Sequence, residues 1–96
     1  MCRSFIAALF VVFIAVSGIV HAAEPSVADS HLNLGNEHYS AGRFGEAAAE
    51  YSRAIALNPR FVNAYYNRGV AHKRADQYEL AIADFTKAIS LDAVDA

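Results

Sequence analysis

A stretch of ten residues in the middle of the chain recurs at an offset of 34 residues. Residues 49–58, A-E-Y-S-R-A-I-A-L-N, correspond to residues 83–92, A-D-F-T-K-A-I-S-L-D. Every pair except Ala56/Ser90 keeps its size, charge or polarity, and the same offset pairs Gly35 with Gly69 further back. A repeat of this length predicts stacked helical units, because one unit cannot bury its apolar face until a neighbour covers it.

The first residues have a different composition from the rest. Arg3 is followed by the unbroken apolar run Phe5–Val16, Ser17 and Gly18 then interrupt it, and Val20-His21-Ala22 are small or tolerated residues before the expected cleavage site. This order is typical of a secretory signal peptide, and the run is shorter than the roughly 20 residues that span a bilayer. We therefore expect residues 1–22 to be removed after export to the periplasm or the medium. The alternative is an uncleaved segment that anchors the protein in a membrane.

The cysteine content limits how the chain can be stabilised, and its charge limits the kind of partner that it can bind. Cys2 is the only cysteine, so cleavage leaves no disulfide and stability must come from packing. The formal net charge is -2, with basic and acidic residues interspersed. Nucleic acid is therefore not an expected partner, since binding its backbone needs a basic stripe. Once the leader is removed, no polybasic segment remains to hold the protein at a membrane surface.

Capping and turn residues divide the rest of the chain into four expected helices. Ser26 and Asp29 have the spacing of a capping box, and Gly42 supplies a left-handed turn. Asn58 is placed to cap the third helix, with Pro59 in its first turn. The expected helices run from about Val27 to Ala41, from about Phe44 or Gly45 to Leu57, from about Arg60 to Arg74 and from Tyr78 to about Leu91. We predict an all-α fold, in which antiparallel helix-turn-helix hairpins stack as an α-solenoid. Its parts are the signal peptide (1–22), a linker (23–27) and two units (28–61 and 62–95).

The repeated residues also predict the packing. The small residues expected where helices cross are Gly35, Ala47, Ala54, Gly69, Ala81 and Ala88. The large side chains expected to fill the remaining space are Phe44, Tyr51, Tyr78 and Phe85. The expected buried stripe of the trailing helices consists of Ile55, Leu57, Ile82, Ile89 and Leu91. The acidic residues of these helices, including Glu50 and Asp84, are expected on a solvated face with basic neighbours.

These residues resemble the tetratricopeptide repeat family over Ala28–Asp95. The first unit carries the family pattern at Leu34, Gly35, Tyr39, Gly42, Ala47, Tyr51, Ala54 and Pro59. The second carries it at Tyr65, Gly69, Tyr78, Ala81, Phe85, Ala88 and Leu91. Departures are His31, His38, Arg68, His72 and Ala93. The resemblance implies a module that binds proteins or peptides in a groove lined by the leading helix of each unit, and the expected signal peptide implies that this module is exported.

The resemblance also implies which side chains face a bound peptide. The candidates are Asn33, Asn36, Tyr39, Asn63, Tyr66, Asn67, Lys73 and Arg74. Asparagine offers a donor and an acceptor to a peptide backbone, and tyrosine adds apolar area with a polar tip. The alternative is that these are polar helix-surface residues without a ligand. A carboxylate clamp of the family would be incomplete, because Leu32 stands where that clamp has lysine.

Neither metal binding nor catalysis is predicted. His38 and His72 lie one repeat apart, too far to converge on one ion, and are expected to be partly buried packing residues. The sequence contains no glycine-rich phosphate loop and no nucleophile placed beside a base. We therefore expect no metal, no cofactor and no enzyme activity.

The second unit has no third unit to cover it. Phe85, Ile89 and Leu91 are expected to remain partly in water, since stacked arrays usually need more repeats. Three explanations are open: self-association through the Phe85/Ile89 edge, docking of this edge into a larger assembly, or membership of a longer repeat protein.

Overall fold

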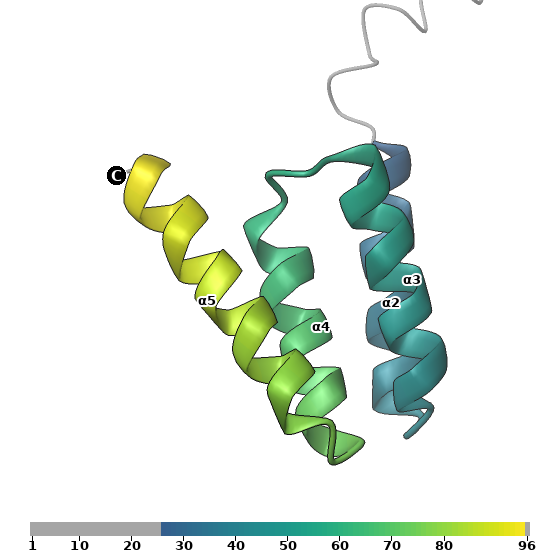
Figure 1. Cartoon of the computed structure of the whole chain (residues 1–96). Helices are drawn as coiled ribbons and strands as arrows, with labels where there is room; N and C mark the ends of the chain where they lie inside the picture. The colour runs from purple at the N-terminus through teal and green to yellow at the C-terminus, as the bar shows by residue number, and fades with distance from the viewer. Residues whose placement is uncertain (1–25, 96) are drawn as a thin grey trace, which may run out of the picture.

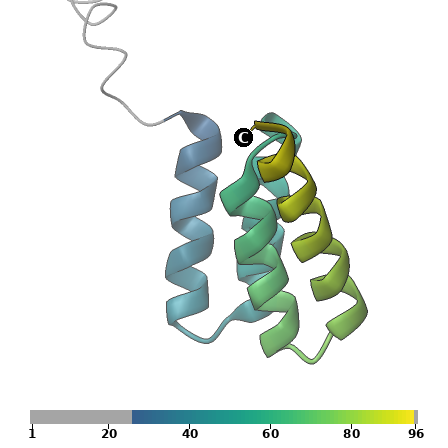
Figure 2. The ribbon, with the colours of Figure 1, turned by 90° about the vertical axis from the view of Figure 1, so that its left-hand side faces the viewer.

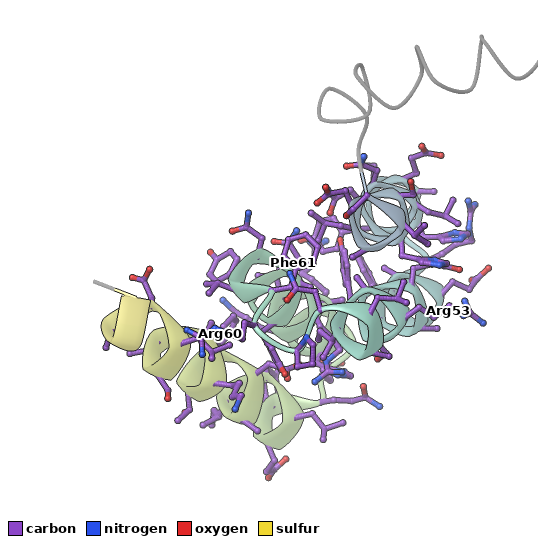
Figure 3. All side chains as sticks on the ribbon, turned by 90° about the horizontal axis from the view of Figure 1, so that it is seen from above. Arg53, Arg60 and Phe61 are labelled. Carbon is purple, nitrogen blue, oxygen red and sulfur yellow. The ribbon has the colours of Figure 1, made fainter. Side chains whose placement is uncertain are left out.

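The computed structural model describes residues 26–95, which form four α-helices. They are α2 (Val27–Ser40), α3 (Phe44–Leu57), α4 (Val62–Arg74) and α5 (Tyr78–Asp95). Helices α2 and α3 form one antiparallel hairpin, and α4 and α5 form the next (Figures 1 and 2). Seen from above, α4 lies between α3 and α5 (Figure 3). The predicted all-α fold of stacked hairpins is confirmed for this part of the chain. The expected signal peptide lies outside the described residues.

The first hairpin begins and turns as its sequence predicts. The Asp29 N–H donates to Ser26 Oγ at 3.1 Å, and the Ser26 N–H donates to the Asp29 carboxylate at 3.2 Å, which completes the capping box. Gly42 has a φ of 80° after the end of α2. Asp76 takes the equivalent place after α4 with a φ of 62°. Asparagine and aspartate tolerate this left-handed conformation better than most other non-glycine residues.

The start of α4 and the end of α5 differ by two and four residues from the approximate bounds that the sequence predicts. Helix α4 begins at Val62 rather than Arg60, because Asn58 ends α3 and forms a turn instead of capping α4. The Phe61 N–H donates to the Asn58 carbonyl at 3.0 Å in this turn. Helix α5 continues past Leu91 to Asp95. It does so because Ala93, a good helix former, occupies the place that Pro59 has in the first unit.

Small side chains let the helices approach closely, as predicted. All six predicted small positions are buried, namely Gly35, Ala47, Ala54, Gly69, Ala81 and Ala88. Tyr51 is 1% exposed, and its ring lies directly against Gly35. Phe85 lies against Gly69 in the same way. The pairing of a glycine with an aromatic ring is thus repeated in both hairpins.

We expect Gly35→Ala to destabilise the protein, although alanine favours helices. A Cβ at this position would lie 2.5 Å from Cε1 of Tyr51, so the buried ring would have to move. The expected loss in the free energy of unfolding is about 1 to 3 kcal/mol. Gly45→Ala is the matched control, because no atom lies within 4 Å of the added Cβ. Denaturant titration should show Gly45→Ala to be neutral or stabilising; an equal loss in both variants would contradict the packing argument.

The predicted apolar stripe of the trailing helices is mostly wrong. Leu57, Ile82 and Ile89 are exposed, and of the five residues only Leu91 is buried, while Ile55 is partly buried. The alanines fill the contacts between helices instead, which leaves the larger aliphatic side chains outside. Tyr78 is also exposed, although a filling role was expected for it.

Two acidic residues at equivalent positions are buried rather than solvated. Glu50 and Asp84 are only 9% and 5% exposed, because the leading helices supply partners that the sequence did not indicate. His31 Nδ1 lies 2.8 Å from Glu50 Oε1, and Arg53 donates to the other carboxylate oxygen at 2.6 Å. The hydrogen bond with His31 lowers the pKa of Glu50 despite its burial, and the charge of Arg53 adds to this effect.

Arg68 connects the two hairpins. Its Nε and Nη2 donate to the Asp84 carboxylate at 2.8 and 2.7 Å. Its Nη1 donates to Ser52 Oγ on α3 at 3.0 Å. The hydrogen bonds to Asp84 raise the pKa of the guanidinium, so it stays charged. One side chain therefore binds the trailing helices of both units.

The lowered pKa of Glu50 predicts acid sensitivity. A carboxylate whose pKa is lowered by folding stabilises the folded state above its unfolded pKa of about 4.3, and this contribution disappears as the pH falls through the folded value. We expect Glu50→Gln to be less stable than wild type at neutral pH, with a smaller further loss on acidification to about pH 3. Denaturant titrations at both pH values test this. His31→Asn should likewise reduce the loss of stability on acidification. An acid dependence in Glu50→Gln equal to that of wild type would contradict the conclusion that Glu50 causes it.

Candidate functional site

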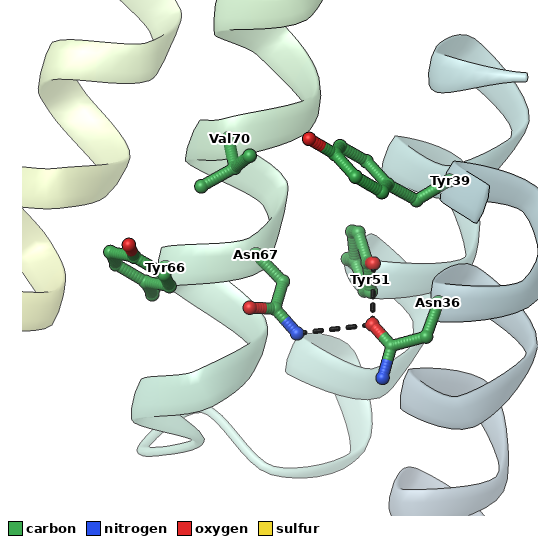
Figure 4. Close-up of a pocket in the computed structure, with 6 residues that line it drawn as sticks. All are labelled: Asn36, Tyr39, Tyr51, Tyr66, Asn67 and Val70. Atoms are coloured by element: carbon green, nitrogen blue, oxygen red, sulfur yellow. Dashed lines mark hydrogen bonds between the residues drawn. The ribbon is translucent and has the colours of Figure 1, made fainter. Parts of the chain in front are cut away.

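A pocket of about 220 Å³ opens between the first hairpin and α4. Its lining residues come from three helices and are Asn36, Tyr39, Tyr51, Tyr66, Asn67 and Val70 (Figure 4). Helices α2 and α4 are the leading helices of the two units, and they supply all lining residues except Tyr51. The pocket therefore lies where the resemblance placed a groove.

Two asparagines from different units meet at this pocket. Asn36 Oδ1 accepts a hydrogen bond from the Tyr51 hydroxyl at 2.6 Å and another from Asn67 Nδ2 at 3.1 Å (Figure 4). Burial raises the pKa of Tyr51, so its hydroxyl keeps the proton that it donates. The two bonds use both lone pairs of the Asn36 carbonyl and fix the orientation of both amide groups.

One donor group and one acceptor remain available. Within residues 26–95, neither the amide nitrogen of Asn36 nor the carbonyl oxygen of Asn67 has a hydrogen-bond partner. Figure 4 shows the Asn67 oxygen on the side of Tyr66 and the Asn36 nitrogen directed away from Asn67. Each peptide unit of a backbone carries one C=O and one N–H. A peptide could therefore accept from Asn36 and donate to Asn67.

Arg74 fixes the aromatic end of the pocket. Its Nη1 donates to the Tyr39 hydroxyl at 3.2 Å, and its guanidinium carbon lies 5.0 Å from the centre of the Phe44 ring. The rings of Tyr39 and Phe44 meet edge to face at 5.3 Å. Arg74 thus holds side chains of the first hairpin from α4, rather than extending as a free cation into the groove.

The structure brings together only part of the predicted site. Four of the eight candidates line the pocket, namely Asn36, Tyr39, Tyr66 and Asn67. Asn33 and Lys73 are exposed outside it. Asn63 and Tyr66 line a second, more open depression of about 310 Å³ beside α5.

Sequence reasoning placed Tyr51 in the core and missed its hydroxyl at the pocket. A signal was present, because the equivalent residue of the second unit is Phe85, so the hydroxyl occurs only in the first unit.

The histidines of the described segment have other partners. His38 accepts from Arg43 at 3.1 Å, and His72 lies 2.9 Å from Gln77 Oε1. Within this segment, no three histidine, cysteine or acidic side chains are placed to hold a metal ion. Nor is any helix there both long and apolar enough to cross a membrane.

Comparisons with known proteins agree with this architecture. A family model described as TPR repeat matches residues 35–76, and one described as tetratricopeptide repeat matches residues 62–93. The crystal structure of MamA is similar at a TM-score of 0.69 and 28% sequence identity, over 71% of this chain and 40% of that one. No curated protein matches. The two family matches together span residues 35–93, and this segment consists of tetratricopeptide repeats, which form scaffolds for protein interactions.

Proposed function

We propose that the protein is an exported interaction module that binds a peptide segment of a partner protein in the pocket between α2 and α4. The observation that carries this proposal is the Asn36–Asn67 hydrogen bond of 3.1 Å. It spans two units and leaves one donor group and one acceptor unused. The bound segment needs no particular side chain to satisfy them, because the backbone supplies both complementary groups.

The surroundings of the asparagine pair support this proposal. The hydrogen bond from the Tyr51 hydroxyl orients Asn36 before any ligand arrives, so less entropy is lost when a peptide binds. Tyr66 is 55% exposed and offers its ring to an apolar side chain beside the pocket. Nothing in this arrangement activates a nucleophile, so the proposed action is equilibrium binding without chemistry.

A peptide library displayed on phage tests the proposal, followed by calorimetry with the selected peptide and the full chain. We expect Asn36→Ala with Asn67→Ala to weaken binding at least about tenfold, or about 1.4 kcal/mol. The matched control is Asn33→Ala, which removes the same kind of side chain from α2 at an exposed position outside the pocket. An equal loss in this control, or selection of no peptide, would contradict the proposal.

Export is the second part of this proposal, and it is supported by the apolar run Phe5–Val16 behind Arg3, the break at Ser17 and Gly18, and the small residue Ala22 at the expected cleavage site. Intact mass measurement of the protein recovered from the cell envelope and the medium tests it. A chain that begins at Ala23 agrees with the proposal, and a chain that retains residues 1–22 contradicts it.

A further inference from the structure

An apolar face of α5 lies at the end of the stack. Ile82, Phe85, Thr86 and Ile89 follow the spacing of one helix face. Ile82 and Ile89 are 63% and 69% exposed, and Phe85 is partly buried. Among the described helices α5 packs on α4 alone, and Figures 1 and 3 show it at the edge of the array. We call these four residues the α5 apolar face.

The first hairpin shows how such a face is covered. The equivalent residues of α3 are Ala48, Tyr51, Ser52 and Ile55, and α3 packs on α4 as well as α2. Tyr51 is 1% exposed and Ile55 is partly buried, whereas the equivalent Ile89 is 69% exposed. The main difference between the two faces is therefore that α4 covers the face of α3, whereas no described helix covers the face of α5.

Helix α4 shows what kind of helix fits. Ala64 and Ala71 are fully buried and lie two turns apart on one side of α4, and Ala71 packs in a cluster with Tyr51. Between them, Arg68 donates to the hydroxyl of Ser52 at 3.0 Å. The α5 apolar face offers the hydroxyl of Thr86 at the place of Ser52. The matching helix thus has small residues seven apart and an arginine between them.

Charge adds a second requirement. Helix α5 contains the acidic residues Glu79, Asp84, Asp92 and Asp95 against the one basic residue Lys87, and of these Asp84 is already paired with Arg68 of α4. Helix α4, which covers the equivalent face of α3, contains no acidic residue and ends with Lys73 and Arg74. A helix that covers α5 is therefore favoured when it is basic.

A second copy of the chain does not meet these requirements. Its α4 is already enclosed between α3 and α5. Its α2 has Ser30 and Glu37 at the places of Ala64 and Ala71, and Leu34 at the place of Arg68. Pairing α5 with itself would bring acidic residues together. We propose that the α5 apolar face docks a basic amphipathic helix of a partner protein, with alanine or glycine seven residues apart and an arginine between them. This surface shares no residue with the peptide pocket, although Tyr66, which lines that pocket, contacts Phe85 and lines a depression together with Ile89.

A synthetic peptide of residues 59–77 is the probe, because it contains the sequence of α4. The full chain is labelled at its isoleucine methyl groups and titrated with this peptide by NMR. We expect saturable shifts of the Ile82 and Ile89 signals and little change at Ile55, which α4 already shields. The peptide with Ala64→Glu and Ala71→Glu should bind at least about tenfold more weakly.

Protein variants locate the docking site. Ile89→Asp should abolish the shifts at Ile82, and it should not unfold the chain because Ile89 is 69% exposed. Leu80→Asp is the matched control: Leu80 is 51% exposed but lies two residues from Ile82, and therefore on the opposite side of α5. It should bind the peptide like wild type. Circular dichroism should show that both variants keep their helices.

Four results would overturn the proposal. The first is the absence of shifts at Ile82 and Ile89, and the second is equal binding of the glutamate-substituted peptide. The third is a loss of peptide binding in Asn36→Ala with Asn67→Ala, because this result would place the peptide in the pocket. The fourth is a dimer in sedimentation that Ile89→Asp converts to a monomer, because the occupant would then be a second copy of the chain. The first two leave the peptide-pocket proposal untouched.

Discussion

Replacing Tyr51 with alanine is expected to lower the free energy of unfolding by about 4 kcal/mol. The ring is 1% exposed and fills the space beside Gly35, which has no side chain to close the cavity. A stability of about 5 kcal/mol is typical at the low end for a small domain, so the variant should keep only about 1 kcal/mol of stability and should populate the unfolded state measurably. Thermal and denaturant unfolding followed by circular dichroism measure the loss.

Two control variants separate the contribution of the buried ring from that of its hydroxyl and from the effect of truncating an exposed tyrosine. Tyr51→Phe removes only the hydrogen bond to Asn36 and should cost about 1 kcal/mol. Phe85 already occupies the equivalent position of the second hairpin, which shows that the site accepts phenylalanine. Tyr78→Ala, at a residue 54% exposed, should cost less than about 0.5 kcal/mol. A loss in Tyr51→Phe as large as that in Tyr51→Ala would show that the hydrogen bond, not packing, dominates.

Arg68→Met is expected to lower the free energy of unfolding by about 3 kcal/mol. It removes the guanidinium that holds Asp84 at 2.7 and 2.8 Å, and the carboxylate stays buried. His72 Nε2, at 3.7 Å from Asp84, is too far to replace these hydrogen bonds. The contact between Arg68 and Ser52 is lost as well. Denaturant titration at neutral pH measures the change.

The double variant Arg68→Met with Asp84→Leu tests the cause of this loss. It removes the buried charge with its partner, and its stability should return to within about 1 kcal/mol of wild type. Arg43→Met is the surface control, because both of its contacts are solvent-exposed, namely the pair with Glu46 at 3.7 Å and the hydrogen bond to His38 at 3.1 Å. It should cost less than about 0.5 kcal/mol. If the double variant were as unstable as Arg68→Met, the unpaired carboxylate would not be the cause.

The repeated small residues and the turn at Gly42 allowed the fold to be predicted, because they act locally. Alanine and glycine at equivalent places of both units specify close helix crossings regardless of the surroundings. The first residue of α4 was not predictable in the same way. Asn58 and Pro59 are compatible with capping a helix. In the structure they form a turn instead, because the Phe61 N–H donates to the Asn58 carbonyl.

The partners of buried groups were the hardest to predict. Glu50 and Asp84 have basic neighbours along their own helices, yet His31 and Arg68 reach them from other helices. The same holds at the pocket, where the Asn36–Asn67 contact joins residues 31 positions apart in sequence. Helix periodicity indicates which side of a helix a residue occupies, but not which side chain of another helix meets it.

The position of α5 has a consequence for the order of unfolding. Because α5 rests on α4 alone among the described helices, fewer contacts must break to detach it than to detach any inner helix. Its amide hydrogens should therefore exchange with solvent sooner than those of α3, through partial opening while the first hairpin stays folded. The terminal helix is then the least stable segment of the array and the one whose stability depends most on a bound neighbour.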